Sequence, residues 1–274
     1  MTRPIEEQAI LVTGATDGLG RGVAAELARR GAAVLLHGRS AERGEQALAE
    51  LRLVARSDRM QLYLADLSSL AEVRRLAEEI ESDHDRLDVL VNNAGIVADK
   101  RALSQDGYEL TFAVNHLSHF LLTALLLPLL RRSAPARIVN VASIGQSPID
   151  FDDVMLERGY DGFGAYAQSK LAQIMFSFEL AERLRADGQE GVTVNTLHPA
   201  TLMDTKMVRQ SFGRGRTSVE EGVEAVVRLA VAEDVEGVDG RYFDGLEEST
   251  ADAQAYDVEA RRRLWELSEE LTRP

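Results

Sequence analysis

The chain alternates strand-like and helix-like segments over almost its whole length, which restricts it to a small group of folds. Short apolar runs typical of strands occur near 9–13, 33–37, 60–64, 88–92, 137–142, 192–197 and 241–243. Helical patterns separate them, near 19–30, 41–55, 69–82, 107–131, 164–186 and 218–232. This alternation is typical of a parallel sheet with helices on both faces, and right-handed crossovers make it doubly wound. We therefore expect one α/β domain over residues 1–274, a doubly wound Rossmann fold with about seven parallel strands.

A glycine-rich turn follows the first apolar run. Residues 14–20 read Gly-Ala-Thr-Asp-Gly-Leu-Gly, and a helical pattern begins there. The unpaired N–H groups and the dipole at a helix N-terminus bind phosphate, and glycines let a diphosphate lie against the backbone. The spacing G-x-x-x-G-x-G differs from the G-x-G-x-x-G of the standard dinucleotide fingerprint. We predict a nucleotide-binding turn formed by Gly14, Thr16, Asp17, Gly18, Leu19 and Gly20.

A second motif carries candidate acid/base chemistry. Lys170 follows Tyr166 by four residues, and a helix brings such positions onto one face. An ammonium beside a phenol favours the phenolate, so we expect the pKa of Tyr166 to fall below its usual value of about 10. Tyr166 would then serve as a general acid/base near neutral pH.

Composition narrows the class of protein. The net charge of −14 disfavours nucleic acid and anionic membranes as partners. The absence of cysteine excludes disulfides and thiolate metal sites. The strongest apolar run, 120–130, is too short for a membrane span, and the polar, acidic start does not resemble a signal peptide. We therefore expect a cytoplasmic protein without a membrane span.

Five motifs in sequence order resemble those of the short-chain dehydrogenase/reductases. The glycine turn is similar to that family's T-G-x-x-x-G-x-G, and Asn92-Asn93-Ala94-Gly95 is similar to its N-N-A-G motif. Asn115, Ser143 and the pair Tyr166 and Lys170 stand where the family has its catalytic tetrad. The long stretch between Ser143 and Tyr166 resembles the retinol-dehydrogenase and protochlorophyllide-reductase-like branch.

The resemblance implies hydride transfer between a nicotinamide and a carbonyl or alcohol carbon. Tyr166 would exchange the proton, Lys170 would lower its pKa and bind the nicotinamide ribose, and Ser143 would donate to the substrate oxygen. Asn115 would hold a water that links Lys170 to solvent. The cofactor half would cover about 8–145, with the catalytic helix and substrate loop in about 146–274. No metal is expected.

The end of the second apolar run bears on the choice of cofactor. Arg39 and Ser40 lie there, and positions 36–40 contain no carboxylate. Arginine suits the 2′-phosphate of NADP, whereas an acidic residue suits the ribose of NAD. We therefore expect NADP(H) to be favoured over NAD(H), the alternative being a solvated Arg39 and use of NAD. Asp17 replaces the basic residue that NADP users often carry in the turn.

The resemblance also implies contacts to the adenosine half of the cofactor. Asp66 would accept from the adenine amino group or cap the following helix, and Leu67 would lie near the ring. The run Asn93-Ala94-Gly95 would lie behind the ribose. Asn92 is interpreted instead as a structural residue that ties neighbouring strands together.

The segment after the sixth run departs from the family pattern. Pro199 is followed by Ala200 where the family has glycine, and alanine disfavours positive φ, so the turn should differ locally. Either Thr201 or Thr205 would contact the nicotinamide carboxamide. We interpret His198 as a packed histidine at a strand end rather than an additional acid/base.

The substrate side is less specific. Glycines and flexible apolar residues in 202–216 suit a lid over a substrate, the alternative being a mobile surface loop. Candidate substrate contacts are Ile144, Phe151, Met203, Met207 and Phe212. They indicate a lipophilic small-molecule substrate, although no residue identifies it.

Two other functions remain open on this sequence. One is reduction of a conjugated C=C bond by the same tetrad, and the other is a non-catalytic nucleotide-sensing protein of the same fold. In typical members of the family the helices at 107–131 and 164–186 pair across subunits, which would give a homodimer or homotetramer. The long stretch before Tyr166 could obstruct one of those contacts.

Overall fold

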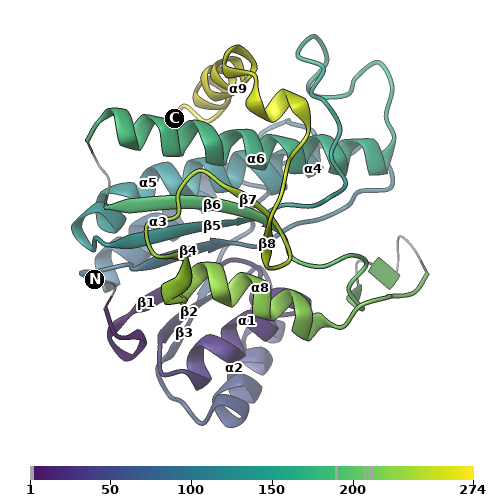
Figure 1. Cartoon of the computed structure of the whole chain (residues 1–274). Helices are drawn as coiled ribbons and strands as arrows, with labels where there is room; N and C mark the ends of the chain where they lie inside the picture. The colour runs from purple at the N-terminus through teal and green to yellow at the C-terminus, as the bar shows by residue number, and fades with distance from the viewer. Residues whose placement is uncertain (1–2, 189–190, 207, 210–212) are drawn as a thin grey trace.

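The fold is built on one sheet. The structure is a computed structural model that describes residues 3–188, 191–206, 208–209 and 213–274. Within these residues the sheet has eight strands in the order β3-β2-β1-β4-β5-β6-β7-β8 (Figure 1). The strands are β1 Ala9–Val12, β2 Ala33–Gly38, β3 Met60–Leu64, β4 Val89–Asn92, β5 Ala136–Val141, β6 Val192–His198, β7 Tyr242–Asp244 and β8 Glu247–Glu248. All neighbours are parallel except β8, which pairs antiparallel with β7. The predicted seven-stranded parallel sheet is confirmed, and β8 is an addition at its edge.

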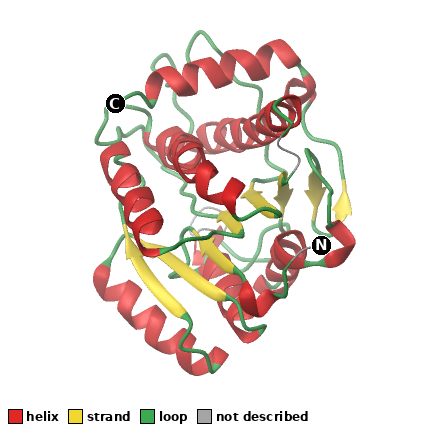
Figure 2. Ribbon diagram, turned by 90° about the vertical axis from the view of Figure 1, so that its left-hand side faces the viewer, coloured by secondary structure: helices red, strands yellow, loops and turns green. Residues whose placement is uncertain are grey.

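Helices cover both faces of this sheet, as predicted. Their bounds are α1 Gly18–Arg29, α2 Ala41–Ala55, α3 Leu70–Asp83, α4 Leu110–Phe112, α5 Ser118–Arg132, α6 Gly162–Ala186, α8 Val219–Val231 and α9 Val258–Leu271. Helices α1, α2 and α8 lie on one face, and α3, α5 and α6 on the other (Figures 1 and 2). Side chains alternate along β1 accordingly, since Ile10 and Val12 join the α1 side and Leu11 the opposite core. Each core is continuous across the parallel strands, which are buried on both faces.

The predicted helix at 107–131 forms in three parts. It consists of α4, a π-helical segment Ala113–Leu117, and α5. Glu109 caps its start by accepting from the backbone N–H groups of Thr111 and Phe112. A π segment holds one residue more than the α-helix would, and such segments are frequent at functional sites. Here it contains Asn115, one of the predicted site residues.

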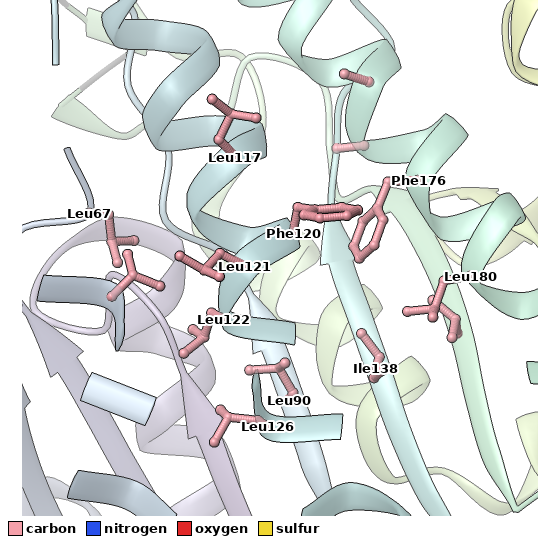
Figure 3. Packing of buried hydrophobic residues seen from close by; sticks show 14 of the residues in the cluster. Leu67, Leu90, Leu117, Phe120, Leu121, Leu122, Leu126, Ile138, Phe176 and Leu180 are labelled. Carbon is pink, nitrogen blue, oxygen red and sulfur yellow. The ribbon is translucent and has the colours of Figure 1, made fainter. Parts of the chain in front are cut away.

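This helix is also long and apolar enough to cross a membrane. Leu110–Arg132 passes that test by length and composition, but 78% of its most apolar window is buried inside the fold. Figure 3 shows Phe120, Leu121 and Leu122 from this helix packed against other buried side chains. The apolar segment is therefore longer than the run 120–130 in the sequence indicates. Burial makes this segment the central helix of one core.

The C-terminal helix α9 lies over α6 (Figure 1). Trp265 packs on Phe120 and Phe176, with ring centroids 5.0 and 6.0 Å away. The buried Arg261 guanidinium of α9 lies 3.5 Å from the buried Glu179 carboxylate of α6. Aromatic packing and this buried ion pair together attach α9 to the outer side of α5 and α6.

Candidate active site

The glycine turn leaves the end of β1 and leads into α1. Gly14 and Gly18 have φ values of 65° and 52°, where other residues are strained. Asp17 caps α1, its carboxylate accepting from the Gly18 N–H at 2.8 Å. A Cβ on Gly20 would overlap with Gly14 O and Asn93 Nδ2, which are too close for an ordinary contact. The turn therefore requires glycine for conformation at two positions and for close approach at a third.

Two other predicted residues of the turn have defined environments. Thr16 lies against Gly38 at the end of β2, where a Cβ on Gly38 would contact the Thr16 methyl group. The Leu19 side chain is buried in the core beneath α1. Leu19 can therefore offer a ligand its backbone only.

The hydroxyl of Thr13 joins the turn to the segment after β4. Thr13 Oγ1 accepts from the backbone N–H groups of Asn93 and Ala94, both at 2.9 Å. The Asn93 side-chain amide donates back to Thr13 O at 2.8 Å. A Cβ on Gly14 would lie 3.0 Å from Ala94 Cα. The two loops, far apart in sequence, thus form one surface at the carboxyl edge of the sheet.

His37 braces the same turn from β2. Its Nδ1 accepts from the Gly14 N–H at 3.2 Å, and its Nε2 lies 3.0 Å from Ala65 O. Because a carbonyl only accepts, Nε2 carries the hydrogen and the ring is neutral. Burial lowers the pKa of His37 to about 4. The histidine therefore fixes the ends of β1, β2 and β3 relative to one another without adding charge.

Ser143, Tyr166 and Lys170 converge at the end of β5. The Ser143 hydroxyl lies near the Tyr166 phenol and interacts with it, and it accepts from Gly145 N at 3.0 Å. Lys170 Nζ lies 5.5 Å from the centroid of the Tyr166 ring. It donates to Val141 O and to Gln173 Oε1, which lies one turn further along α6, both at 2.8 Å. The structure thus brings three of the four predicted tetrad residues together.

The predicted direction of the Tyr166 pKa was wrong for this structure. Burial raises the pKa of Tyr166, and the interaction with Ser143 only partly offsets this effect. The reason is that Lys170 directs its hydrogens to Val141 and Gln173 rather than to the phenol oxygen. Burial also lowers the pKa of Lys170 to about 7, so its positive charge is itself partial near neutral pH.

Asn115 completes the group from the π segment. It is fully buried, and its side chain exchanges two hydrogen bonds with the backbone of Ile96, at 2.8 and 3.0 Å. Its amide also donates to Ser169 Oγ on α6 at 2.9 Å. A Cβ on Gly95 would lie 3.5 Å from both Asn115 Oδ1 and Lys170 Nζ. The segment after β4 therefore contacts both the glycine turn and the tetrad.

Asn92 has the structural role that was predicted for it. Its side-chain amide donates to Asn140 on β5 at 2.8 Å and to Thr123 on α5 at 3.0 Å. These bonds tie β4 to its neighbours beneath the site.

The candidate nucleotide-specificity residues lie beyond the turn. Arg39 is exposed and forms no ion pair among the residues that the structure describes. Ser40 caps α2, its hydroxyl accepting from Arg43 N at 3.5 Å. Asp66 accepts from Ser68 N at 2.9 Å, so it caps the turn before α3, while Ser69 caps that helix itself. Leu67 is buried in the core on the α3 side.

The segment after β6 places the two candidate threonines differently. His198 is buried, and its Nε2 lies 3.0 Å from the Thr201 hydroxyl, as expected for a packed histidine. A Cβ on Gly18 would lie 3.6 Å from the Thr205 methyl group. Leu202, rather than Ala200, takes the left-handed conformation, with φ of 51°. Pro199 lies against Gly222 of α8.

The predicted substrate residues are spread over several elements. Ile144 is 55% exposed next to Ser143. Phe151 packs near α9, with the Arg263 guanidinium 4.8 Å from its ring centroid. Met203 packs against α8 in the α1-side core. Met207 and Phe212 lie outside the described residues.

Sequence reasoning missed three side chains at this site. Phe163 is half exposed, and its ring centroid lies 6.4 Å from that of Tyr166. Gln173 orients Lys170, and the buried His119 lies 3.2 Å from Thr13 Oγ1. Helical spacing could have found the last two, since Gln173 follows Lys170 by three residues and His119 follows Asn115 by four. Among the described residues no cluster of His, Asp or Glu could hold a metal.

Comparison with known proteins gives consistent matches. The family profile described as short chain dehydrogenase matches residues 8–214. Human retinol dehydrogenase 13 is 39% identical, covering 97% of this chain and 85% of that protein. Human retinol dehydrogenase 14 is 40% identical, with 95% and 84% covered. An uncharacterised protein from Mycobacterium Paratuberculosis has a similar structure, with TM-score 0.78, 31% identity and 97% and 93% coverage. A short chain dehydrogenase from Shigella flexneri complexed with NADP has TM-score 0.72, 28% identity and 88% and 98% coverage.

Proposed function

We propose that this chain, which belongs to the short chain dehydrogenase family and resembles its retinol dehydrogenases, is an NADP(H)-dependent oxidoreductase that interconverts the carbonyl and alcohol forms of a lipophilic small molecule. One observation carries the proposal: the Ser143 hydroxyl meets the Tyr166 phenol beside Lys170, next to the glycine turn. This is the arrangement that proton exchange with a substrate oxygen requires.

Tyr166 and Ser143 handle the proton. In reduction, Tyr166 donates its phenolic hydrogen to the oxygen that becomes the alcohol, and in oxidation it accepts that hydrogen. Burial raises the pKa of Tyr166, which keeps the phenol protonated and ready to act as the acid. Ser143 donates to the substrate oxygen or to the phenolate and so stabilises the charge that develops there.

Lys170 adjusts the basicity of the phenol. With a pKa of about 7, about half of the molecules carry the ammonium at neutral pH. The ammonium favours the phenolate, and the bonds of Lys170 to Val141 and Gln173 hold it in place. Asn115 braces the loop at Ile96 and contacts α6 through Ser169, which orients these groups relative to one another.

The residues around the glycine turn fit a nicotinamide dinucleotide. The close contacts of Gly14 and Gly20 leave room for bare backbone only, and α1 presents its unpaired N–H groups there. When bound, the nucleotide supplies or accepts the hydride. Asp66 and the run Asn93-Ala94-Gly95 would hold its adenosine half, and Tyr166 and Lys170 would flank its nicotinamide ribose.

Preference for NADP(H) is supported by Arg39. Arg39 is exposed at the carboxyl edge of the sheet and forms no ion pair among the described residues, so its guanidinium can bind a ligand. Ser40 and the N-terminus of α2 lie beside it. These groups together can bind a 2′-phosphate.

Thr205 is the better candidate for the carboxamide contact. It lies against Gly18, whereas the hydroxyl of Thr201 is engaged by His198. Pro199 would shape the turn that carries both threonines.

A lipophilic substrate is supported by apolar side chains beside Tyr166. Ile144 and Phe163 are exposed to 55% and 50% although both are large and apolar. Exposed apolar groups at a site of proton exchange favour an apolar ligand. The retinol dehydrogenases that the chain resembles are named for such an alcohol.

The fold also supports proposals on assembly and location. Helix α9 occupies the outer side of α5 and α6, the helices that a dimer of this kind would pair. We infer that the chain does not dimerise through them, and sedimentation velocity showing a monomer would support this. We also propose a cytoplasmic location, because the chain lacks cysteine, and cell fractionation would test it.

The central experiment follows the loss of NADPH absorbance with a panel of aldehydes, ketones and quinones. We expect at least one lipophilic carbonyl compound to be reduced to its alcohol. Tyr166→Phe should abolish turnover while the Kd for NADPH stays within about threefold, because the phenol acts on the proton rather than on binding. Retained turnover in Tyr166→Phe would reject the assignment.

Product analysis separates the alternatives. A saturated carbonyl product from an enone would indicate reduction of a conjugated C=C bond on the same tetrad. NADPH binding without turnover of any carbonyl compound would favour a nucleotide-sensing protein.

A further inference from the structure

A buried histidine connects the glycine turn with the tetrad. His119 lies on α5 and is 1% exposed. Its Nε2 is 3.2 Å from Thr13 Oγ1, and its Nδ1 is 3.0 Å from Asn115 O. The amide of Gln173, which holds Lys170, lies 3.2 Å from the same Nδ1. His119 therefore contacts both halves of the site.

The hydrogen bonds of His119 determine its tautomer. Thr13 Oγ1 already accepts two hydrogen bonds, so Nε2 must accept from it, and Nδ1 carries the hydrogen toward Asn115 O, its nearer neighbour. Burial and the nearby Lys170 charge lower the pKa of His119 to about 3, so the ring is neutral and Nε2 has a free lone pair. In this tautomer the Gln173 amide is a packing neighbour of the ring, and the Thr13 hydroxyl donates to Nε2.

This bond completes the hydrogen bonding of Thr13. A hydroxyl has two lone pairs and one hydrogen. Both lone pairs accept from the backbone of Asn93 and Ala94, so the hydrogen must point to His119 Nε2 at 3.2 Å or to Val91 O at 3.4 Å. The nearer acceptor directs the hydroxyl so that its lone pairs face the two N–H groups.

We propose that His119 is a positioning residue for nucleotide binding, which acts by directing the Thr13 hydroxyl that joins the glycine turn to the Asn93-Ala94 segment. The inference rests on the proposed function, because it assumes that the nucleotide lies on this surface. Loss of the acceptor would let the hydroxyl rotate and loosen the contact between Gly14 and Ala94, where a Cβ would already lie 3.0 Å away.

His116 provides a matched control. It lies one turn earlier on the same continuous helix, is also 1% exposed, and has a pKa that burial lowers to about 3. Its Nε2, however, bonds to Ser268 of α9 at 2.8 Å, on the side away from the turn. Substitution of His116 therefore reports the cost of removing a buried histidine from this helix.

The experiment compares side chains of equal length with and without an acceptor. His119→Gln keeps an oxygen that can reach Thr13, whereas His119→Met does not. The same two substitutions are made at His116, and the Kd for NADPH is measured by fluorescence, with Tm of the free protein and steady-state kinetics alongside.

We expect His119→Met to raise the Kd and the KM for NADPH about tenfold, the effect of one lost buried hydrogen bond. His119→Gln should stay within about threefold of the wild type, and kcat at saturating NADPH should change little in either. Both His116 variants should lower Tm without changing the Kd. Adding His119→Met to Thr13→Val should not weaken binding further, because the hydroxyl that His119 directs is already absent in Thr13→Val.

Three results would overturn the inference: equal Kd values for His119→Met and His119→Gln, an equal rise of Kd in His116→Met, or additive effects with Thr13→Val. If His119→Met does not fold, His119→Leu provides the acceptor-free variant for the same comparison. A wild-type protein that binds neither NADPH nor NADH would instead reject the proposed function, which keeps the two failures distinct.

Discussion

Mild acid should destabilise this protein steeply, because three histidines are buried in neutral form. Burial lowers the pKa of His37 to about 4 and those of His116 and His119 to about 3, against about 6.5 in an unfolded chain. At a pH between the folded and unfolded pKa values, these histidines are protonated in the unfolded chain but neutral in the folded protein. The stability is therefore fully present above pH 6.5 and is lost as the pH falls toward 4.

The size of the effect follows from these shifts. At pH 5 the pH lies about 1.5 units below the pKa of each histidine in the unfolded chain. Each histidine then lowers the free energy of unfolding by about 2 kcal/mol, at about 1.4 kcal/mol per unit. The three together remove about 6 kcal/mol, and the slope near pH 5.5 is about 4 kcal/mol per pH unit. Domains are typically stable by about 5–15 kcal/mol, so much of the folding free energy should be gone at pH 5.

Urea unfolding between pH 7.5 and 5 measures this directly. The single tryptophan, Trp265, packs from α9 against α5 and α6 and reports the loss of tertiary structure by its fluorescence. His116→Gln removes one of the three titrating groups and should reduce the slope by about a third, whatever it does to stability at pH 7.5. A free energy of unfolding at pH 5.5 within about 1 kcal/mol of that at pH 7.5 would refute the reasoning.

Three further predictions concern single contacts. Arg39→Asp should lower the ratio of kcat/KM for NADPH over NADH about 100-fold, since a charged hydrogen bond is replaced by repulsion; an unchanged ratio would show that Arg39 does not face the 2′-phosphate. Gly20→Ala should abolish saturable NADPH binding, because the added Cβ would collide with Gly14 O and Asn93, and titration calorimetry would detect any binding that remains. Arg261→Met should lower the free energy of unfolding by about 2 kcal/mol, because the charged hydrogen bonds of Arg261 are lost while Arg183 still pairs with Glu179 at 2.8 Å, and urea titration at pH 7.5 would measure it.

Most of the fold could be predicted because its signals are local. Apolar runs and helical spacing placed strands and helices within a few residues of their bounds, and helix α2 has the predicted bounds, 41–55. Strand β8 was missed because Glu247–Glu248 is too short and too charged to carry an apolar pattern. The π segment was missed because its residues give no sequence signal that separates a π-helix from the α-helix on either side.

The proximity of the four tetrad candidates could be predicted, but their electrostatics could not. The sequence motifs predicted that Asn115, Ser143, Tyr166 and Lys170 lie close together, and they do in the structure. The pKa of Tyr166 was predicted in the wrong direction because it depends on where Lys170 Nζ points and on burial, neither of which spacing determines. The link from His119 to Thr13 joins residues far apart in sequence, so only the folded chain reveals it.

The π segment determines where Asn115 lies in the site. Because Ala113–Leu117 accommodates one extra residue, deleting a single residue there would let the helix wind regularly. The helix beyond the deletion would keep nearly its present direction, because the π segment has already absorbed the additional residue. His119 would stay near Thr13, whereas Asn115 and its neighbours within the segment would shift. A one-residue gap here in a related sequence should therefore mark a site in which Asn115, rather than the helix as a whole, is placed differently.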